Sequence, residues 1–165
     1  LGGKLAAPDR VVLTLVGDGG FGVNPSPLAT AVEYNIPVIW IVMNNSAFGT
    51  IAGLEYSHYK TRYGTVFTTP DGKPYSPNWA EVAKAYGVDA IRVDSAEAFK
   101  PALEKALASN KPFLIDVPME NIGVPTPGCW NINDIYTPKP NVVNGKVRKN
   151  EKGEYVPPSH SGSHK

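Results

Sequence analysis

The chain has 165 residues, of which 16 are Lys or Arg and 15 are Asp or Glu, so its formal net charge is only +1. This balance argues against nucleic acid as the main partner, because neutralising a phosphate backbone needs a clustered basic surface. No apolar run approaches the roughly 20 residues of a membrane helix, and no signal peptide is visible, so no membrane partner is expected. The single cysteine, Cys129, leaves no disulfide framework, and we expect a cytoplasmic location.

The first third of the chain predicts a strand, a turn, a helix and a second strand. Apolar residues at 11–16 and 38–43 are typical of buried strands. The first strand breaks into Gly17-Asp18-Gly19-Gly20, where we expect a turn, and the second ends on Asn44-Asn45. Between them the sequence predicts a short helix over residues 25–34 that begins on a proline.

The next segments continue the alternation of helix and strand. Residues 50–77 are rich in Tyr, Gly, Thr and Pro and predict a loop, with a turn at Asp71-Gly72. The next predicted elements are a helix over 78–86 and a strand over 90–93. A helix over 96–108 follows, which Ser95 caps and which carries Phe99, Leu103 and Leu107 on its core face. The last predicted element is a strand over 113–117. This order predicts an α/β fold with a doubly wound, mostly parallel sheet and helices on both faces.

The composition divides the chain into a domain over residues 1–118, a Pro-rich C-terminal arm over 119–140 and a polar tail over 141–165. The apolar residues of the arm need a neighbouring domain or subunit to pack against, and we interpret the tail as extended or disordered. Residues 1–9 resemble the last turn of a helix that began earlier, because glycine, small residues and proline are helix stop signals. We therefore expect this sequence to be one piece of a longer chain.

Polar groups follow both N-terminal strands, and ligands of parallel sheets bind at the carboxyl ends of the strands. Glycines on both sides of Asp18 allow a tight turn and a close approach to a ligand, and their N–H groups can hold a phosphate. Asp18 offers a carboxylate oxygen and Asn45 an amide oxygen, which suit Mg²⁺. The pattern favours a metal–diphosphate site; the alternative is an ordinary turn and strand end.

Gly17-Asp18-Gly19, followed after about two dozen residues by Asn44-Asn45, resembles the motif of the thiamine diphosphate-dependent enzyme superfamily. The flanking residues, such as Pro8-Asp9-Arg10 and Ile36-Pro37-Val38, are similar to those of acetolactate synthases. The resemblance extends over roughly residues 1–118. It implies the C-terminal, diphosphate-binding domain of a three-domain enzyme that uses thiamine diphosphate and Mg²⁺, and it leaves FAD open.

The resemblance also implies roles for individual residues. The implied metal ligands are Asp18, Asn45 and the backbone carbonyl of Ala47. The implied cofactor-binding residues are Asp18, Gly19, Gly20, Asn45, Ala47, Phe48 and Gly49, although a packing role for Phe48 is equally open. The catalytic acid and base are not identified, because the activating glutamate is implied to lie in another domain and usually reaches across from another subunit. We therefore expect a homodimer or homotetramer, and no activity from this piece alone.

The implied reaction is the cleavage or formation of a C–C bond next to a carbonyl of a small-molecule substrate, a 2-oxo acid, as in acetolactate synthase-like carboligases and decarboxylases. Acetolactate synthases carry a Gln-Trp pair shortly after Asn-Asn, whereas Gly53-Leu54 stands here. A hydrolase or lyase of a diketone therefore stays open, as does a non-catalytic diphosphate-binding domain, against which the retained Asp18 and Asn45 argue. His58 could act on a substrate proton, although a surface or packing role is the favoured interpretation.

Overall fold

The computed structural model describes residues 1–121, 142–143 and 146–147. The chain divides into two compact units, Leu1–Thr126 and Pro127–Lys165. In the second unit β5 (Val142–Val143) pairs antiparallel with β6 (Lys146–Val147). Most of the predicted arm and tail, with Cys129, lies outside the described residues.

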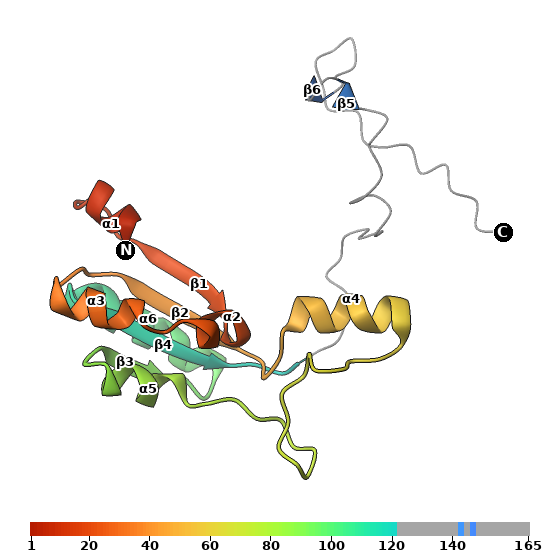
Figure 1. The fold of residues 1–165 in the computed structure, drawn as a ribbon. Coiled ribbons are helices and arrows are strands. Elements are labelled where there is room, and N and C mark those ends of the chain that lie inside the picture. The colour runs from red at the N-terminus through yellow and green to blue at the C-terminus, as the bar shows by residue number, and fades with distance from the viewer. Residues whose placement is uncertain (122–141, 144–145, 148–165) are drawn as a thin grey trace. The chain divides into compact units, whose positions relative to one another are not determined.

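The first unit is built on a four-stranded parallel sheet with the strand order β1-β2-β4-β3 (Figure 1). Its strands are β1 (Leu13–Gly17), β2 (Ile39–Asn44), β3 (Asp89–Arg92) and β4 (Phe113–Pro118). Each of them lies within two residues of a strand that the sequence predicts. The α/β fold with a parallel sheet is therefore confirmed.

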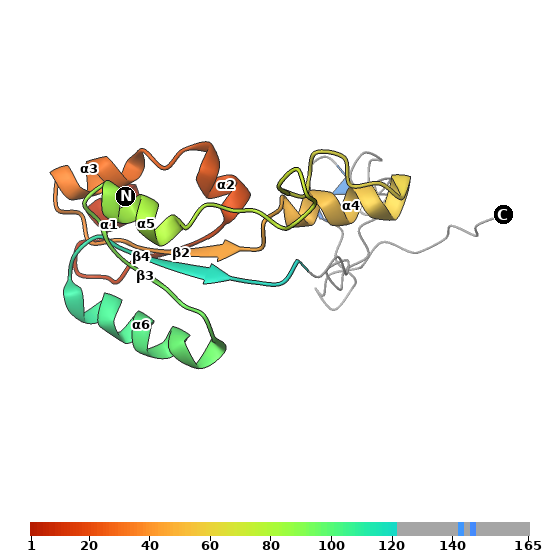
Figure 2. The same cartoon turned by 90° about the horizontal axis from the view of Figure 1, so that it is seen from below.

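Helices cover both faces of this sheet, and α4 lies beyond the carboxyl ends of its strands (Figure 1). The helices are α1 (Gly2–Ala6), α2 (Asp18–Val23), α3 (Pro27–Glu33), α4 (Gly49–Tyr59), α5 (Trp79–Ala85) and α6 (Ala96–Ser109). Figure 2 shows α2, α3 and α5 on one face and α6 on the other. Because the chain reverses its direction across the sheet between β3 and β4, a right-handed crossover brings α6 to the opposite face.

Two apolar clusters hold these layers together, one on each face of the sheet. Successive residues of a strand point to opposite faces. On β2, Trp40 and Val42 accordingly join the cluster that contains Leu28 of α3 and Ala83 of α5. Ile39 and Ile41 join the second cluster, which contains Ala102 and Ala106 of α6. Within the described residues, no helix has the length and hydrophobicity that crossing a membrane requires.

The predicted turn at Gly17–Gly20 is wrong, because β1 runs directly into α2 at Asp18. The next helix begins at Pro27 rather than at residue 25. Both prolines suit a first helical position, where a missing N–H costs nothing, so the sequence alone does not distinguish the two starts.

The prediction of a loop over residues 50–77 is wrong for its first part, which forms α4 (Gly49–Tyr59). Ala52 is the one residue of this helix that is fully buried. An apolar stripe, which is the usual sequence signal of a surface helix, is therefore lacking. The predicted turn at Asp71-Gly72 is confirmed, because Gly72 has a φ of +81° and the N–H of Thr69 donates to the carbonyl of Lys73 at 2.9 Å.

The predicted cap of α6 is confirmed, because Ser95 accepts a hydrogen bond from the N–H of Ala98. Helix α5 begins one residue later than predicted, at Trp79, because the Asn78 side chain caps it by accepting a hydrogen bond from the N–H of Glu81. Leu107, however, is 43% exposed and does not belong to the core face of α6. Residues spaced by four drift by about 40° per step around a helix, so Leu107 lies about 80° from Phe99. Phe99 and Leu103 pack, as predicted, against the cluster that contains Ala102 and Ala106.

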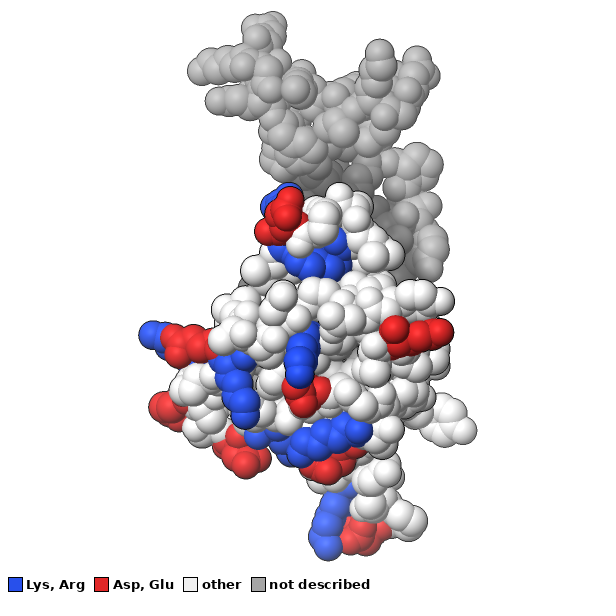
Figure 3. Space-filling view, turned by 90° about the vertical axis from the view of Figure 1, so that its left-hand side faces the viewer, with Lys and Arg blue, Asp and Glu red and all other residues white. Residues whose placement is uncertain are grey.

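Charged side chains of both signs are interspersed on the face that Figure 3 shows. Three exposed ion pairs join Lys73 to Asp71, Lys84 to Glu81 and Lys100 to Glu104, at 2.8, 2.7 and 3.9 Å. Lys73 and the Thr69 hydroxyl lower the pKa of the Asp71 carboxyl. Exposed pairs of this kind contribute little to stability, so the two apolar clusters provide most of the stability of the fold.

A buried leucine and an exposed leucine allow a test of the core packing. Leu114 of β4 is fully buried, and Leu114→Ala should lower the free energy of unfolding by about 2 to 5 kcal/mol, because it leaves a cavity. Leu107→Ala is the matched control and should change it by less than about 1 kcal/mol. Urea titration followed by circular dichroism measures both, and equal losses would contradict the described packing.

Candidate metal and diphosphate site

The candidate site lies at the carboxyl ends of β1 and β2, which are neighbours in the sheet. Gly17 is opposite Met43 in the parallel register, so Asp18 and Asn45 follow these paired residues on adjacent strands. Figure 1 shows this edge beside α2 and the start of α4. Ligands of open parallel sheets bind at such an edge.

The three residues that the family resemblance implies as metal ligands lie together there. With its amide turned so that its hydrogen bonds are satisfied, Asn45 donates from Nδ2 to Oδ1 of Asp18 at 3.1 Å and to the carbonyl oxygen of Ala47 at 3.0 Å. The opposite orientation would place the amide oxygen beside these two acceptors, which is favourable only with a positive charge among them. One charged and two neutral oxygens form the kind of donor set that Mg²⁺ takes in proteins.

The Asn45 amide can take two orientations. Its nitrogen donates to both Asp18 and Ala47 when no cation is present, whereas a bound cation would turn the amide oxygen inward. Asp18 is only 1% exposed, and its Oδ2 has no hydrogen-bond partner among the described residues. Because the turned amide still leaves this buried oxygen without a partner, the donor set fits a divalent cation.

This arrangement is not built from acidic clusters. Within the part of the chain that the structure describes, no three His, Cys, Asp or Glu side chains gather as a metal site would require. The candidate centre instead uses one carboxylate, one amide and one backbone oxygen. The Gly-Asp-Gly and Asn-Asn spacing indicated Asp18 and Asn45, and the family resemblance implied Ala47.

A short backbone pairing holds the Ala47 carbonyl in place. Ser46 has a φ of +56°, which is uncommon for a residue other than glycine, and it turns the chain away from β2. Ala47 then forms an antiparallel bridge with Val66. The N–H of Phe48 donates to the carbonyl of Thr65 at 2.9 Å. The sequence did not indicate this pairing, because the partners are separated by the whole of α4.

Two glycines at this edge have no room for a side chain. A Cβ on Gly19 would lie 2.6 Å from the Phe48 ring, and one on Gly49 would lie 2.5 Å from the side-chain amide of Asn45. Neither residue has a positive φ, so their small size matters here rather than their conformational freedom. Gly20 is exposed on the first turn of α2, where N–H groups lack acceptors within the helix.

Phe48 is half-buried and packs edge-to-face on Phe67, with 5.1 Å between the ring centres. The structure thus gives Phe48 packing contacts with Gly19 and Phe67. A further contact with a diphosphate stays a prediction for Phe48, as it does for Gly19, Gly20 and Gly49.

Glu55 and His58 lie on α4, in the segment for which a loop was expected. The Glu55 carboxylate accepts hydrogen bonds from the N–H of Tyr63 and the hydroxyl of Thr65, both at 2.8 Å, and so ties the returning chain to α4. No sequence signal marked this role. His58 is exposed, and its Nδ1 lies 3.0 Å from the carbonyl of Leu54 in its own helix, which agrees with a surface role.

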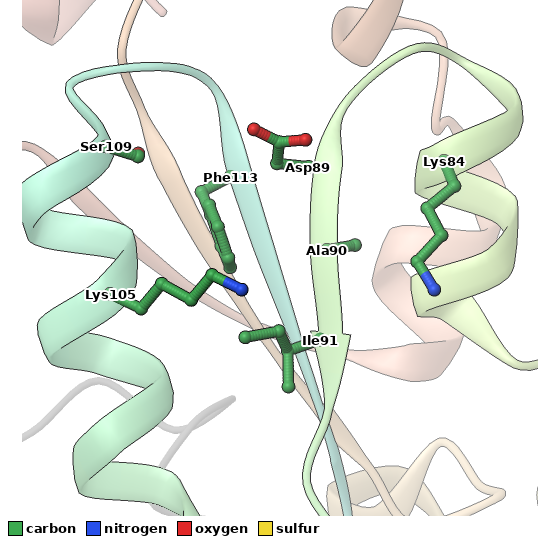
Figure 4. Close-up of a pocket in the computed structure, with 7 residues that line it drawn as sticks. All are labelled: Lys84, Asp89, Ala90, Ile91, Lys105, Ser109 and Phe113. Atoms are coloured by element: carbon green, nitrogen blue, oxygen red, sulfur yellow. The ribbon is translucent and has the colours of Figure 1, made fainter.

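A cavity of about 410 Å³ lies at the other end of the sheet, near the amino ends of β3 and β4. Figure 4 shows Lys84 of α5 and Lys105 of α6 on the two sides of β3, with Asp89 beside them. None of the residues that the sequence indicates for the metal or the diphosphate lines this cavity. It is therefore not part of the candidate site.

The contact between Gly49 and Asn45 makes a test of the site. Gly49→Ala should weaken Mg²⁺ binding on the order of ten-fold, because the added methyl group pushes the Asn45 amide out of place. Gly53→Ala is the control one helical turn further along α4, where a Cβ would meet no atom within 4 Å. Titration with Mn²⁺ as a spectroscopic substitute measures both variants. Unchanged affinity in Gly49→Ala would contradict this geometry.

Curated relatives and solved structures are similar to this chain. A probable acetolactate synthase large subunit of Methanocaldococcus jannaschii is 33% identical over 152 residues, which cover 90% of this chain and 24% of that protein. A 3D-(3,5/4)-trihydroxycyclohexane-1,2-dione hydrolase of Bacillus subtilis is 38% identical over 117 residues, which cover 71% of this chain and 18% of that protein. The structure of a thiamine diphosphate-dependent 4-hydroxybenzoylformate decarboxylase from Rhodococcus jostii matches with a TM-score of 0.62 and 34% identity, over 72% of this chain and 21% of that one.

The chain thus spans about a quarter or less of the length of these relatives. The family model described as the thiamine pyrophosphate enzyme, C-terminal TPP binding domain, matches residues 1–117. That match includes the whole parallel sheet up to Val117 and all three oxygens of the candidate centre. The chain therefore belongs to the thiamine pyrophosphate enzyme family and carries the C-terminal cofactor-binding domain of that family.

Proposed function

We propose that this chain binds the diphosphate end of thiamine diphosphate through Mg²⁺, in an enzyme that cleaves or forms a C–C bond next to the carbonyl of a 2-oxo acid. The observation that supports it is the cluster of Asp18, Asn45 and the Ala47 carbonyl, in which the buried Oδ2 of Asp18 has no partner among the described residues. Mg²⁺ usually completes its coordination with substrate phosphates and water, which suits a site with these few protein ligands.

Thiamine diphosphate, when bound, supplies the carbanion chemistry. The residues of this chain hold and orient it. Asp18, Asn45 and the Ala47 carbonyl would hold the cation. Gly19 and Gly49 let the Phe48 ring and the Asn45 amide lie against the backbone. The Phe48 ring, fixed by Phe67, would close one side of the site. We propose that the glycine N–H groups donate to the diphosphate oxygens.

The proton transfers need groups that this chain does not identify. We propose that an activating glutamate comes from another part of the complete enzyme, across the interface of a homodimer or homotetramer. This part of the proposal is supported by the small share of the relatives' length that the chain spans. FAD, if the enzyme uses it, would also bind outside the present domain. We propose a cytoplasmic location.

Hydrolysis of a cyclic 1,2-diketone is the second candidate. It is favoured by the 38% identity to the Bacillus subtilis dione hydrolase and by Gly53-Leu54 in place of the Gln-Trp pair of acetolactate synthases. Both residues lie on α4, and a Cβ on Gly53 would meet nothing within 4 Å. A non-catalytic domain is disfavoured, because a scaffold has no need for a buried carboxylate whose Oδ2 lacks a partner among the described residues.

Removing the carboxylate tests the cofactor site. Asp18→Ala should abolish Mg²⁺-dependent binding of thiamine diphosphate, because it removes the charged ligand. Asp9→Ala, which removes an exposed carboxylate, should leave binding unchanged. Calorimetric titration of the complete protein with thiamine diphosphate, with and without Mg²⁺, measures the effect. Equal affinity in Asp18→Ala and the parent would refute the site.

The two candidate reactions differ in their products. Decarboxylation or carboligation of a 2-oxo acid releases CO2, whereas hydrolysis of a cyclic 1,2-diketone adds water and opens the ring to an acid without CO2. We expect the complete enzyme, supplied with thiamine diphosphate and Mg²⁺, to release CO2 from 2-oxo acids. Ring opening of a cyclic diketone without CO2 from any 2-oxo acid would establish the second candidate instead.

A further inference from the structure

The two asparagines of the Asn-Asn pair have different surroundings. Asn45 contributes to the candidate metal centre, whereas Asn44 is 4% exposed and its Nδ2 donates to Oδ1 of Asp116 at 3.0 Å. The same nitrogen lies 3.4 Å from the carbonyl oxygen of Pro77. The carbonyl of Asn44 accepts a hydrogen bond from the N–H of Met119 at 2.7 Å. Asn44 is therefore held at its side chain and at its backbone.

Asp116 of β4 is fully buried and accepts two further hydrogen bonds. The N–H of Trp79, the first residue of α5, donates to its Oδ2 at 3.1 Å. Nη1 of Arg92 on β3 donates to the same oxygen at 2.6 Å. The carboxylate thus joins the end of β2, the adjacent strand β3 and the start of α5.

A buried carboxylate stays favourable only when its charge is paired and its oxygens are hydrogen-bonded. Both conditions hold for Asp116, which allows little variation in the position of Asn44. Because the peptide after Asn44 leads directly into Asn45, a displacement of Asn44 moves the metal ligand. A defined outer partner of this kind can change metal affinity by roughly 10- to 100-fold.

We propose that Asp116 is a positioning residue for the metal centre, which acts through Asn44 to fix the placement of Asn45 and of the Ala47 carbonyl. This inference rests on the proposed function, since it needs the cation to bind at Asp18, Asn45 and Ala47. It assigns to the first asparagine of the pair a role that differs from metal ligation.

The contact with Trp79 extends the same argument. Residues 60–78 return from α4 to α5, and their last part reaches the network through the Pro77 carbonyl and the Trp79 N–H. The Asp116 carboxylate therefore fixes the position of the turn that holds the candidate metal ligands. It also fixes the point at which residues 60–78 join α5. A change at Asp116 should displace these two segments together.

The test is a double-mutant cycle in the complete enzyme, with Asn44→Ala, Asp116→Asn and the double variant. The readout is the affinity for Mn²⁺ in the presence of thiamine diphosphate, measured by electron paramagnetic resonance. Each single variant should bind Mn²⁺ on the order of ten-fold more weakly. If Asp116 acts through Asn44, the double variant should bind no more weakly than the weaker single variant, because the effects of linked residues do not multiply. Asp94→Asn, at an exposed carboxylate next to β3, is the control and should bind as the parent does.

Thermal unfolding of the metal-free variants separates positioning from general stability. A lowered midpoint in Asp116→Asn with unchanged Mn²⁺ affinity would show a structural role only and would overturn the inference. Losses in affinity that multiply in the double variant would overturn it as well. Should Asp116→Asn fail to fold, Asn44→Ala alone decides, since unchanged affinity there refutes the connection. Failure of the parent enzyme itself to bind Mn²⁺ would refute the proposed function rather than this inference.

Discussion

The in-register parallel pairing of β1 with β2 is the constraint on which the candidate site depends. Gly17 lies opposite Met43, so the residues that follow on each strand meet at one edge of the sheet. A shift of the register by one residue would turn every side chain of the strand to the other face, and the two apolar clusters of the sheet resist such a shift. The packing of the core therefore determines the distance between Asp18 and Asn45.

The polar residues that are buried in the described part of the chain are Asp18, Asn44 and Asp116. They belong to the ends of β1 and β2 and to the neighbouring strand β4. The two carboxylates differ in how their charge is compensated. Asp116 has Arg92, the start of α5 and the Asn44 amide as partners, whereas Oδ2 of Asp18 has no partner among the described residues. This contrast distinguishes Asp116, whose charge is compensated within the sheet, from Asp18, which is a candidate ligand for a cation at the edge of the sheet.

The segment between β2 and α5 contacts the surroundings of both carboxylates. It leaves the sheet at Ser46, forms α4, and returns to pair with the residues that carry the Ala47 carbonyl. Glu55 holds the returning chain, and the Pro77 carbonyl and Trp79 N–H meet the Asp116 network. The turn that contains Asn45 and Ala47 is thus supported by the sheet on one side and by the returning segment on the other. Such support from separate elements gives a ligand set a defined geometry.

The sequence by itself determined the strands, the parallel α/β fold and the family, because apolar runs, capping residues and the spacing from Asp18 to Asn45 are local signals. It also indicated Asp18 and Asn45 as candidate metal ligands, to which the family resemblance added Ala47. Only the tertiary structure decided that β1 passes directly into α2, that α4 is a helix, and that Ala102 and Ala106 rather than Leu107 face the sheet. It also decided that Asn44 binds Asp116, 72 residues away along the chain. Contacts of this kind depend on which strands become neighbours, and no local pattern of residues encodes that choice.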